Sequence, residues 1–195
     1  MKAYHGKPRK RRIIGNGLAT AADMIGRIEP GCEIACMTAG QYGFIEILNH
    51  LLNQIGPSHC IICTWTANYM NIKKALAFCS DSRLLSCRWM ADKTFATRKP
   101  ELSQHLVACF GADCINTASN HGKFILLYND HWSLVLRTSM NLDEPPMIEF
   151  FQISDDKEFM QYVKTRCGDI FTGQLNVTYK KKAKPININI LELKL

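Results

Sequence analysis

The chain has 195 residues, of which 47% are hydrophobic and 21% are charged, as is typical of one globular domain with a sizeable core. No apolar run approaches the roughly 18 residues that a membrane-spanning helix needs, and the charged N-terminus lacks the apolar segment of a secretion signal. We therefore expect a soluble cytoplasmic protein with no membrane partner.

The net charge of +7 is concentrated near the two ends of the chain. Residues 1–12 carry six basic side chains and residues 180–184 carry four; the other 14 basic and 17 acidic residues give the rest a net charge of −3. Basic tails bind polyanions by releasing counterions, although they also serve simply to keep a protein soluble. As candidate nucleic-acid-binding residues we select Arg9, Lys10, Arg11, Arg12, Lys180, Lys181, Lys182 and Lys184.

The nine cysteines are an odd number, and most of them lie inside apolar runs, which is typical of a reducing compartment. Cys60 and Cys63 have the spacing of a metal-binding pair, but they lie in a predicted strand. Residues three apart in a strand face opposite sides, so the two thiols cannot easily bind one ion. We predict that the cysteines are small buried core residues, and we expect no metal site and no cofactor.

Along the chain, strand-like and helix-like segments alternate. A basic arm and a short helix near residues 19–26 make up the first segment, which ends at Pro30 and Gly31. Apolar runs and helical spacing then predict strands at 33–38, 59–65, 84–90 and 113–117, and helices at 42–55, 68–79 and 100–110. A polar loop at 91–99 separates the third strand from the third of these helices.

Further along, we predict a strand at 148–153, a helix from Ser154 or Asp155 to about Cys167, and a strand-like run at 186–193 that could add an edge strand. This alternation predicts an α/β fold, a mixed sheet with helices on both faces. We divide the chain into a basic arm with a short helix (1–30), an α/β domain (31–170) and a basic tail (171–195).

The stretch from His121 to Asn141 contains the most informative pattern. Two β-favouring runs, 124–128 and 132–136, flank a polar turn of Asn, Asp and His and predict a hairpin. Because residues i and i+2 of a strand share a face, His121 and Lys123 point the same way, as do Ser139 and Asn141. The hairpin would gather an imidazole, an ammonium, a hydroxyl and an amide, a set that suits a phosphate group.

This arrangement resembles the phospholipase D superfamily, whose signature is His-x-Lys, four residues, Asp, and then Gly-Ser-x-Asn. The chain departs from the signature at two positions: Tyr128 stands in place of the Asp, and Thr138 in place of the Gly. It contains one such group on a predicted strand, and its order of elements is similar to a single half-domain, as in small bacterial and phage members of the superfamily.

The resemblance implies a metal-independent phosphodiesterase whose active site forms across the two-fold axis of a homodimer. His121 would attack the phosphorus to give a phosphohistidine, while His121 of the partner subunit would protonate the leaving oxygen. Lys123, Ser139 and Asn141 would hold the phosphate oxygens, and Glu149 would orient the imidazole. The basic tails favour DNA or RNA as substrate over lipid head groups.

An alternative stays open, because Tyr128 replaces the Asp of the signature. The chain would then be a catalytically degenerate protein of this fold that binds nucleic acid or a protein partner without turnover. Trp65, Trp89 and Trp132 are predicted to be core or rim residues rather than platforms that stack on bases.

Overall fold

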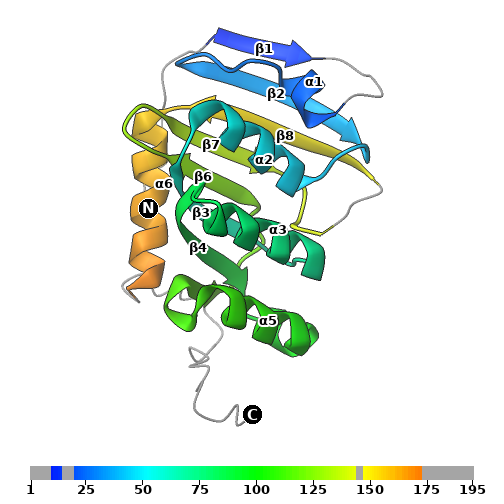
Figure 1. The fold of residues 1–195 in the computed structure, drawn as a ribbon, viewed down its shortest axis with the longest axis vertical. Coiled ribbons are helices and arrows are strands. Elements are labelled where there is room, and N and C mark those ends of the chain that lie inside the picture. The colour runs from blue at the N-terminus through cyan, green and yellow to red at the C-terminus, as the bar shows by residue number, and fades with distance from the viewer. Residues whose placement is uncertain (1–9, 15–19, 144–146, 173–195) are drawn as a thin grey trace, which may run out of the picture.

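The computed structural model describes residues 10–14, 20–143 and 147–172, and its centre is an eight-stranded mixed sheet (Figure 1). Its strands are β1 (Lys10–Ile14), β2 (Cys32–Ala39), β3 (Ser58–Thr64), β4 (Leu84–Asp92), β5 (Ile115–Ala118), β6 (Phe124–Tyr128), β7 (Ser133–Thr138) and β8 (Ile148–Asp155). The spatial order is β1-β2-β8-β7-β6-β3-β4-β5. The predicted mixed sheet is therefore confirmed.

The directions of the strands decide which residues meet. β1 is parallel to β2, and β3, β4 and β5 are parallel to one another, whereas each contact among β2, β8, β7, β6 and β3 is antiparallel. One end of the sheet therefore collects the carboxyl ends of β2, β3, β4, β5 and β7 with the amino ends of β6 and β8. We call this end of the sheet the site end.

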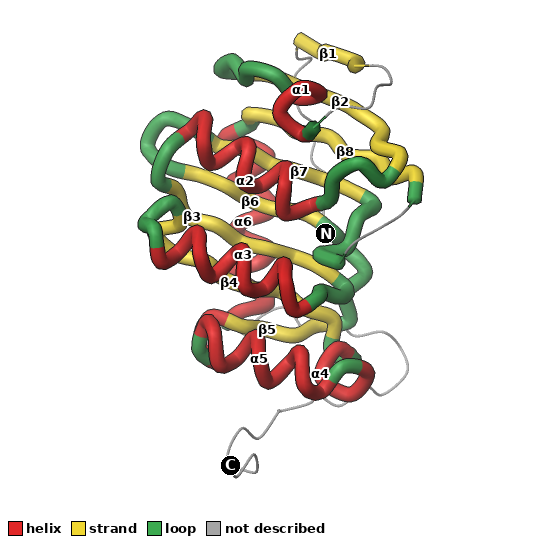
Figure 2. Tube along the Cα trace, turned by 45° about the vertical axis from the view of Figure 1, so that its right-hand side comes forward, coloured by secondary structure: helices red, strands yellow, loops and turns green. Residues whose placement is uncertain are grey.

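Helices cover both faces, as predicted (Figures 1 and 2). They are α1 (Ala21–Ile25), α2 (Phe44–Ile55), α3 (Tyr69–Ser80), α4 (Phe95–Arg98), α5 (Pro100–Phe110) and α6 (Lys157–Phe171). Helices α1, α2, α3 and α5 pack on one face with the larger core, and α6 packs alone on the other face with a smaller core. In the described part of the chain, no helix is both long and apolar enough to cross a membrane.

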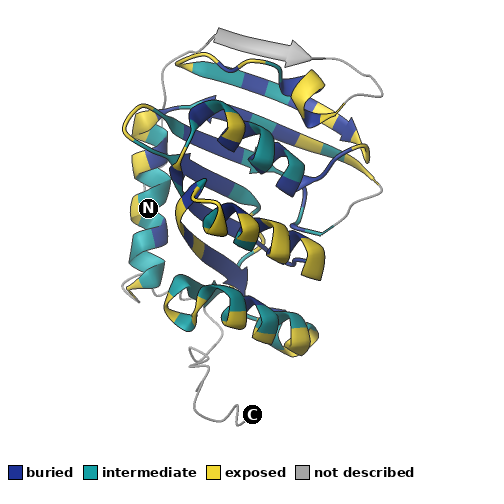
Figure 3. Ribbon diagram, viewed as in Figure 1, coloured by how far each residue is buried: buried dark blue, intermediate teal, exposed yellow. Residues whose placement is uncertain are grey.

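Side chains along the central strands point alternately to the two faces of the sheet, so the same strands contribute residues to both cores. In β3, Cys60 and Ile62 belong to the core under α2, whereas Ile61 and Cys63 belong to the core under α6. The predicted opposite orientation of Cys60 and Cys63 is thus confirmed. Figure 3 shows the result: the middle strands are buried along much of their length, and exposed residues lie on the outer sides of the helices.

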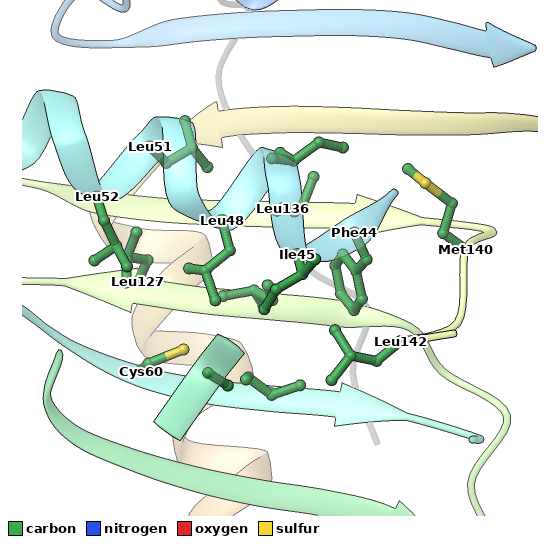
Figure 4. Close-up of a cluster of buried hydrophobic side chains, with 14 of the residues drawn as sticks. Phe44, Ile45, Leu48, Leu51, Leu52, Cys60, Leu127, Leu136, Met140 and Leu142 are labelled. Carbon is green, nitrogen blue, oxygen red and sulfur yellow. The ribbon is translucent and has the colours of Figure 1, made fainter. Parts of the chain in front are cut away.

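Helix α2 has the spacing of apolar residues that one buried helix face requires. Leu48 and Leu52 lie over β6 and β7, close to Leu127 and Leu136 (Figure 4). The backbone N–H of Gly43 donates to Glu46 Oε2 at 3.0 Å and so satisfies one of the free donors at the helix start.

Several local predictions differ from the structure. The helix expected from Ser154 or Asp155 to about Cys167 is α6, which starts at Lys157 and runs to Phe171, because β8 continues to Asp155. Residues 10–14, expected within a basic arm, form strand β1, because the backbone pairs in parallel with β2. The polar loop at 91–99 contains helix α4, and β4 extends to Asp92. The strand expected from residue 113 starts at Ile115, after a 3-10 turn at Ala112–Cys114. The predicted run at 186–193 lies outside the described residues.

Candidate active site

The predicted hairpin forms from β6 and β7, and its open end lies at the site end of the sheet. His121 and Lys123 precede β6, and Lys123 Nζ lies 3.2 Å from Nδ1 and 3.3 Å from Nε2 of His121. The same ammonium donates to the carbonyl oxygen of His121 at 3.0 Å. The backbone N–H of Thr138 donates to the carbonyl oxygen of Lys123 at 3.1 Å, which joins the end of β7 to this segment.

Ser139 follows β7 and is held by β8. Its backbone N–H donates to the carbonyl oxygen of Phe150 at 3.0 Å, and its hydroxyl accepts from the N–H of Phe150 at 3.0 Å. The hydroxyl also donates to the carboxylate of Glu149. Glu149 was expected to contact His121, but in the described structure the His121 ring contacts Lys123 and Trp65. The carboxylate of Glu149 thus contacts Ser139 in the described structure.

Asn141 is placed by the residue that follows it. The backbone N–H of Leu142 donates to Thr64 Oγ1 and to the carbonyl oxygen of Thr66, each at 3.1 Å, which attaches this segment to the end of β3. Asn141 Oδ1 is buried, and no described residue donates a hydrogen bond to it. A buried amide oxygen without a donor is uncommon in folded proteins and calls for an explanation, such as a catalytic role or a bound water.

Charged side chains surround these residues. Burial raises the pKa of Asp143, with a smaller contribution from the charge of Glu149, while the ammonium groups of Lys99 and Lys123 act in the opposite direction. Because charge effects of this kind fall off with distance, the four groups share one electrostatic environment. The site end thus combines the cations Lys99 and Lys123 with the carboxyl groups of Asp143 and Glu149.

Two supporting residues, Asn120 and Asp92, are absent from the sequence prediction. Asn120 Nδ2 donates to Cys63 Sγ at 3.1 Å, and Asn120 Oδ1 accepts from the N–H of Gly122 at 2.8 Å. A Cβ atom on Gly122 would lie 3.1 Å from that oxygen, so the close turn before Lys123 favours glycine.

Asp92, at the end of β4, fixes Asn120 in turn. Its Oδ2 accepts from the N–H of Asn120 at 3.1 Å, and its Oδ1 accepts from the N–H of Thr94 at 2.9 Å. Against the effect of burial, hydrogen bonds from Thr94 and Asn120 lower the pKa of Asp92. A carboxylate at the end of a predicted strand was the only sequence signal for this role.

Trp65 occupies the rim of the site. Its ring centre lies 5.9 Å from that of His121, and the guanidinium carbon of Arg98 lies 3.8 Å from the same Trp65 ring centre. Trp65 is half-buried, in agreement with the predicted core or rim position. The sequence did not indicate its contact with His121.

Tyr128, which stands in place of the signature Asp, lies at the opposite end of β6. At roughly 3.3 Å per residue, the five steps from Lys123 to Tyr128 span about 16 Å. The Tyr128 ring stacks on His59 with centres 5.4 Å apart, and Lys164 Nζ lies 3.7 Å from the ring centre. The substitution therefore affects packing far from His121.

The predicted nucleic-acid-binding residues that the structure describes lie outside the candidate site. Arg9 and the four lysines of 180–184 are outside the described residues, and residues 10–12 lie in β1, the outermost strand beside β2. Within residues 10–14, 20–143 and 147–172, no three His, Cys, Asp or Glu side chains are grouped as ligands for a metal ion.

Comparison with known proteins gives matches in structure alone. No protein-family model and no curated sequence matches the chain. NucT from Helicobacter pylori superimposes with a TM-score of 0.53 at 12% identity, over 72% of this chain and 96% of that chain. A phospholipase D family member, Nuc from Salmonella typhimurium, gives a TM-score of 0.49 at 14% identity, over 72% and 93% of the two chains. The superposition on NucT supports the expected fold class, an α/β fold with a mixed sheet and helices on both faces.

Proposed function

We propose that the protein is a metal-independent phosphodiesterase, a nuclease acting on DNA or RNA, with His121 as the nucleophile. The observation that carries the proposal is the meeting of His121 and Lys123, Ser139 and Asn141 at one end of the sheet, from segments before β6 and after β7. The likeness of the fold to phospholipase D-type structures adds support.

In the first step, an unprotonated ring nitrogen of His121 attacks phosphorus, and the P–O bond to the leaving group breaks. A second imidazole gives its proton to the departing oxygen and then takes one from water, which attacks phosphorus and releases His121. Lys123 neutralises charge on the non-bridging oxygens, and the side chains of Ser139 and Asn141 hold them. Glu149 acts on Ser139 as a positioning residue.

The second imidazole has to come from another copy of the chain, because each copy carries the group of His121, Lys123, Ser139 and Asn141 once. Next to Ser139, four large apolar side chains are between 46% and 70% exposed: Met37, Met147, Ile148 and Phe150. Met37 and Phe150 are register partners on the sheet face that also carries α6. An exposed apolar cluster of this kind is typical of a protein interface, and an isologous contact there would place two site ends close together.

A polymeric substrate suits the charge of the site end. Lys99, Lys123 and Arg98 all lie near His121 or Asp143, and the basic residues near the chain ends add further positive charge. The non-catalytic alternative depended on Tyr128, which lies at the other end of β6 from His121. We therefore favour turnover.

The direct test is cleavage under chelation. Labelled DNA and RNA oligonucleotides are incubated with the protein in EDTA, beside His121→Ala and His131→Ala. His131 is exposed in the β6–β7 turn, away from the site end, and controls for loss of a surface imidazole. We expect cleavage by wild type and His131→Ala, and a loss of at least a thousandfold in His121→Ala, because the nucleophile is removed. Equal activity of the two variants, or cleavage that EDTA abolishes, would refute the proposal.

A further inference from the structure

Arg98 and His121 lie against the same aromatic ring. The Arg98 guanidinium carbon is 3.8 Å from the ring centre of Trp65, and the centre of the His121 ring is 5.9 Å from it. The two groups therefore cannot be further apart than these two distances together. Arg98 is at the end of α4, in a segment expected to be a plain polar loop.

The guanidinium of Arg98 is held in place by three neighbours. Its Nε donates to Thr94 Oγ1 at 2.8 Å, and its Nη2 donates to the carbonyl oxygen of Trp65 at 3.0 Å. Asp92 Oδ1, which is 3.9 Å from Nη2, adds a weak ion pair. Stacking on Trp65 fixes the plane of the group, so little side-chain entropy remains to be lost on binding an anion.

These contacts leave part of the guanidinium unused. Arg98 Nη1 has no hydrogen-bond partner among the described residues, and the residue is exposed to solvent. A planar, fixed guanidinium with free N–H groups beside a phosphate site is suited to bind a further phosphate.

We propose that Arg98, held by Trp65, binds the phosphate next to the scissile one, so that the site selects chains with consecutive phosphodiesters over isolated diesters. This inference rests on the proposed function. It adds a phosphate-binding residue outside the His121 group and assigns the recognition of a polymer to the folded body of the protein rather than to the basic tails alone.

The test compares two substrates in EDTA. A single-stranded oligonucleotide has neighbouring phosphates, whereas bis(p-nitrophenyl) phosphate has one. Arg98→Ala should lower kcat/KM for the oligonucleotide about tenfold to a hundredfold more than for the small diester, because the variant lacks a charged hydrogen bond that only the oligonucleotide can accept. Arg98→Lys, which keeps the charge without the fork, should lie between Arg98→Ala and wild type.

Arg88→Ala is the matched control. Arg88 also stacks on an aromatic ring, that of Phe171 at 3.8 Å, but it lies in β4 on the face covered by α6. It should behave as wild type with both substrates. Melting temperatures of all variants show whether a loss of activity reflects a loss of folded protein.

Binding supplies a readout that does not need turnover. Anisotropy titrations of a labelled single strand at several salt concentrations give the slope of log K against log[salt], which changes by about 0.7 for each phosphate that the protein ceases to bind. We expect the slope of Arg98→Ala to be smaller in magnitude than that of wild type by about 0.7, and the slope of Arg88→Ala to equal that of wild type. An unchanged slope, or an equal loss of kcat/KM on both substrates, would overturn the assignment. Absence of all cleavage by wild type would refute the proposed function, and the salt slope would still decide whether Arg98 binds a phosphate.

Discussion

Tyr128 shows why a motif should be weighed by the position of each residue. In the strand, five steps separate it from Lys123, and its ring contacts His59 and Lys164 rather than any residue of the site end. The departure from the signature therefore concerns the stability of the sheet rather than the chemistry at His121.

We predict that Tyr128→Ala lowers the free energy of unfolding by about 2 kcal/mol, because it removes a half-buried ring and its contact with the Lys164 ammonium. Cleavage per folded molecule in EDTA should stay within twofold of wild type. Urea denaturation and the oligonucleotide assay check the two parts. A large loss of activity in a stably folded variant would place position 128 in the active site.

Single residues could be predicted from sequence where the relevant spacing is local. The pairing of His121 with Lys123, and of Ser139 with Asn141, was predicted from alternation within one hairpin; the structure places these residues just before β6 and just after β7. The contact between Glu149 and Ser139 depends on how β8 pairs with its neighbours, and the contact of Asp92 with Asn120 joins residues 28 positions apart. Pairings of that kind depend on strand order, which local spacing does not determine.

At the scale of elements, buried helices and strands were the most predictable features. Helix α5 begins at Pro100 and ends at Phe110 before Gly111, as its sequence indicated. Strand β1 was missed because its partner, β2, lies some twenty residues further along the chain. The short helix α4 was missed because four residues are too few to show a helical period.

Helix α2 should contribute strongly to stability through its buried face. Leu48 is fully buried over β6 and β7, so Leu48→Ala leaves a cavity that the sheet cannot easily fill (Figure 4). We expect a loss of about 2–5 kcal/mol in the free energy of unfolding, measured by urea denaturation. Leu85→Ala, at a position 56% exposed on β4, is the control and should cost less than about 1 kcal/mol. Equal losses would mean that α2 is loosely packed.

At the scale of the whole molecule, strand direction is what assembles the site. Antiparallel pairing of β6 with β7 and of β7 with β8 brings the amino ends of β6 and β8 to the carboxyl end of β7. The parallel neighbours β3 and β4 add Trp65 and Asp92 from their carboxyl ends. One sheet end therefore receives side chains from separate segments between residues 65 and 149.

The proposed dimer predicts that an exposed apolar residue beside the site is needed for assembly. Phe150→Glu should turn a wild-type dimer into a monomer in light scattering and abolish cleavage, because a carboxylate would be buried at the interface and the second imidazole would be missing. Leu85→Glu, at an exposed apolar position at the other end of the sheet, should stay dimeric and active. A wild-type protein that is monomeric at concentrations where it cleaves would exclude the two-copy mechanism.

The proposed mechanism depends above all on a covalent bond between His121 and the substrate phosphorus. The decisive experiment is to quench the protein during turnover of bis(p-nitrophenyl) phosphate in EDTA, digest it without acid, and sequence the peptides by mass spectrometry. We expect a nitrophenyl-phosphoryl group on His121 and none in His121→Ala. Modification of another residue, such as Ser139, or unmodified His121 in protein that is turning over, would rule the mechanism out.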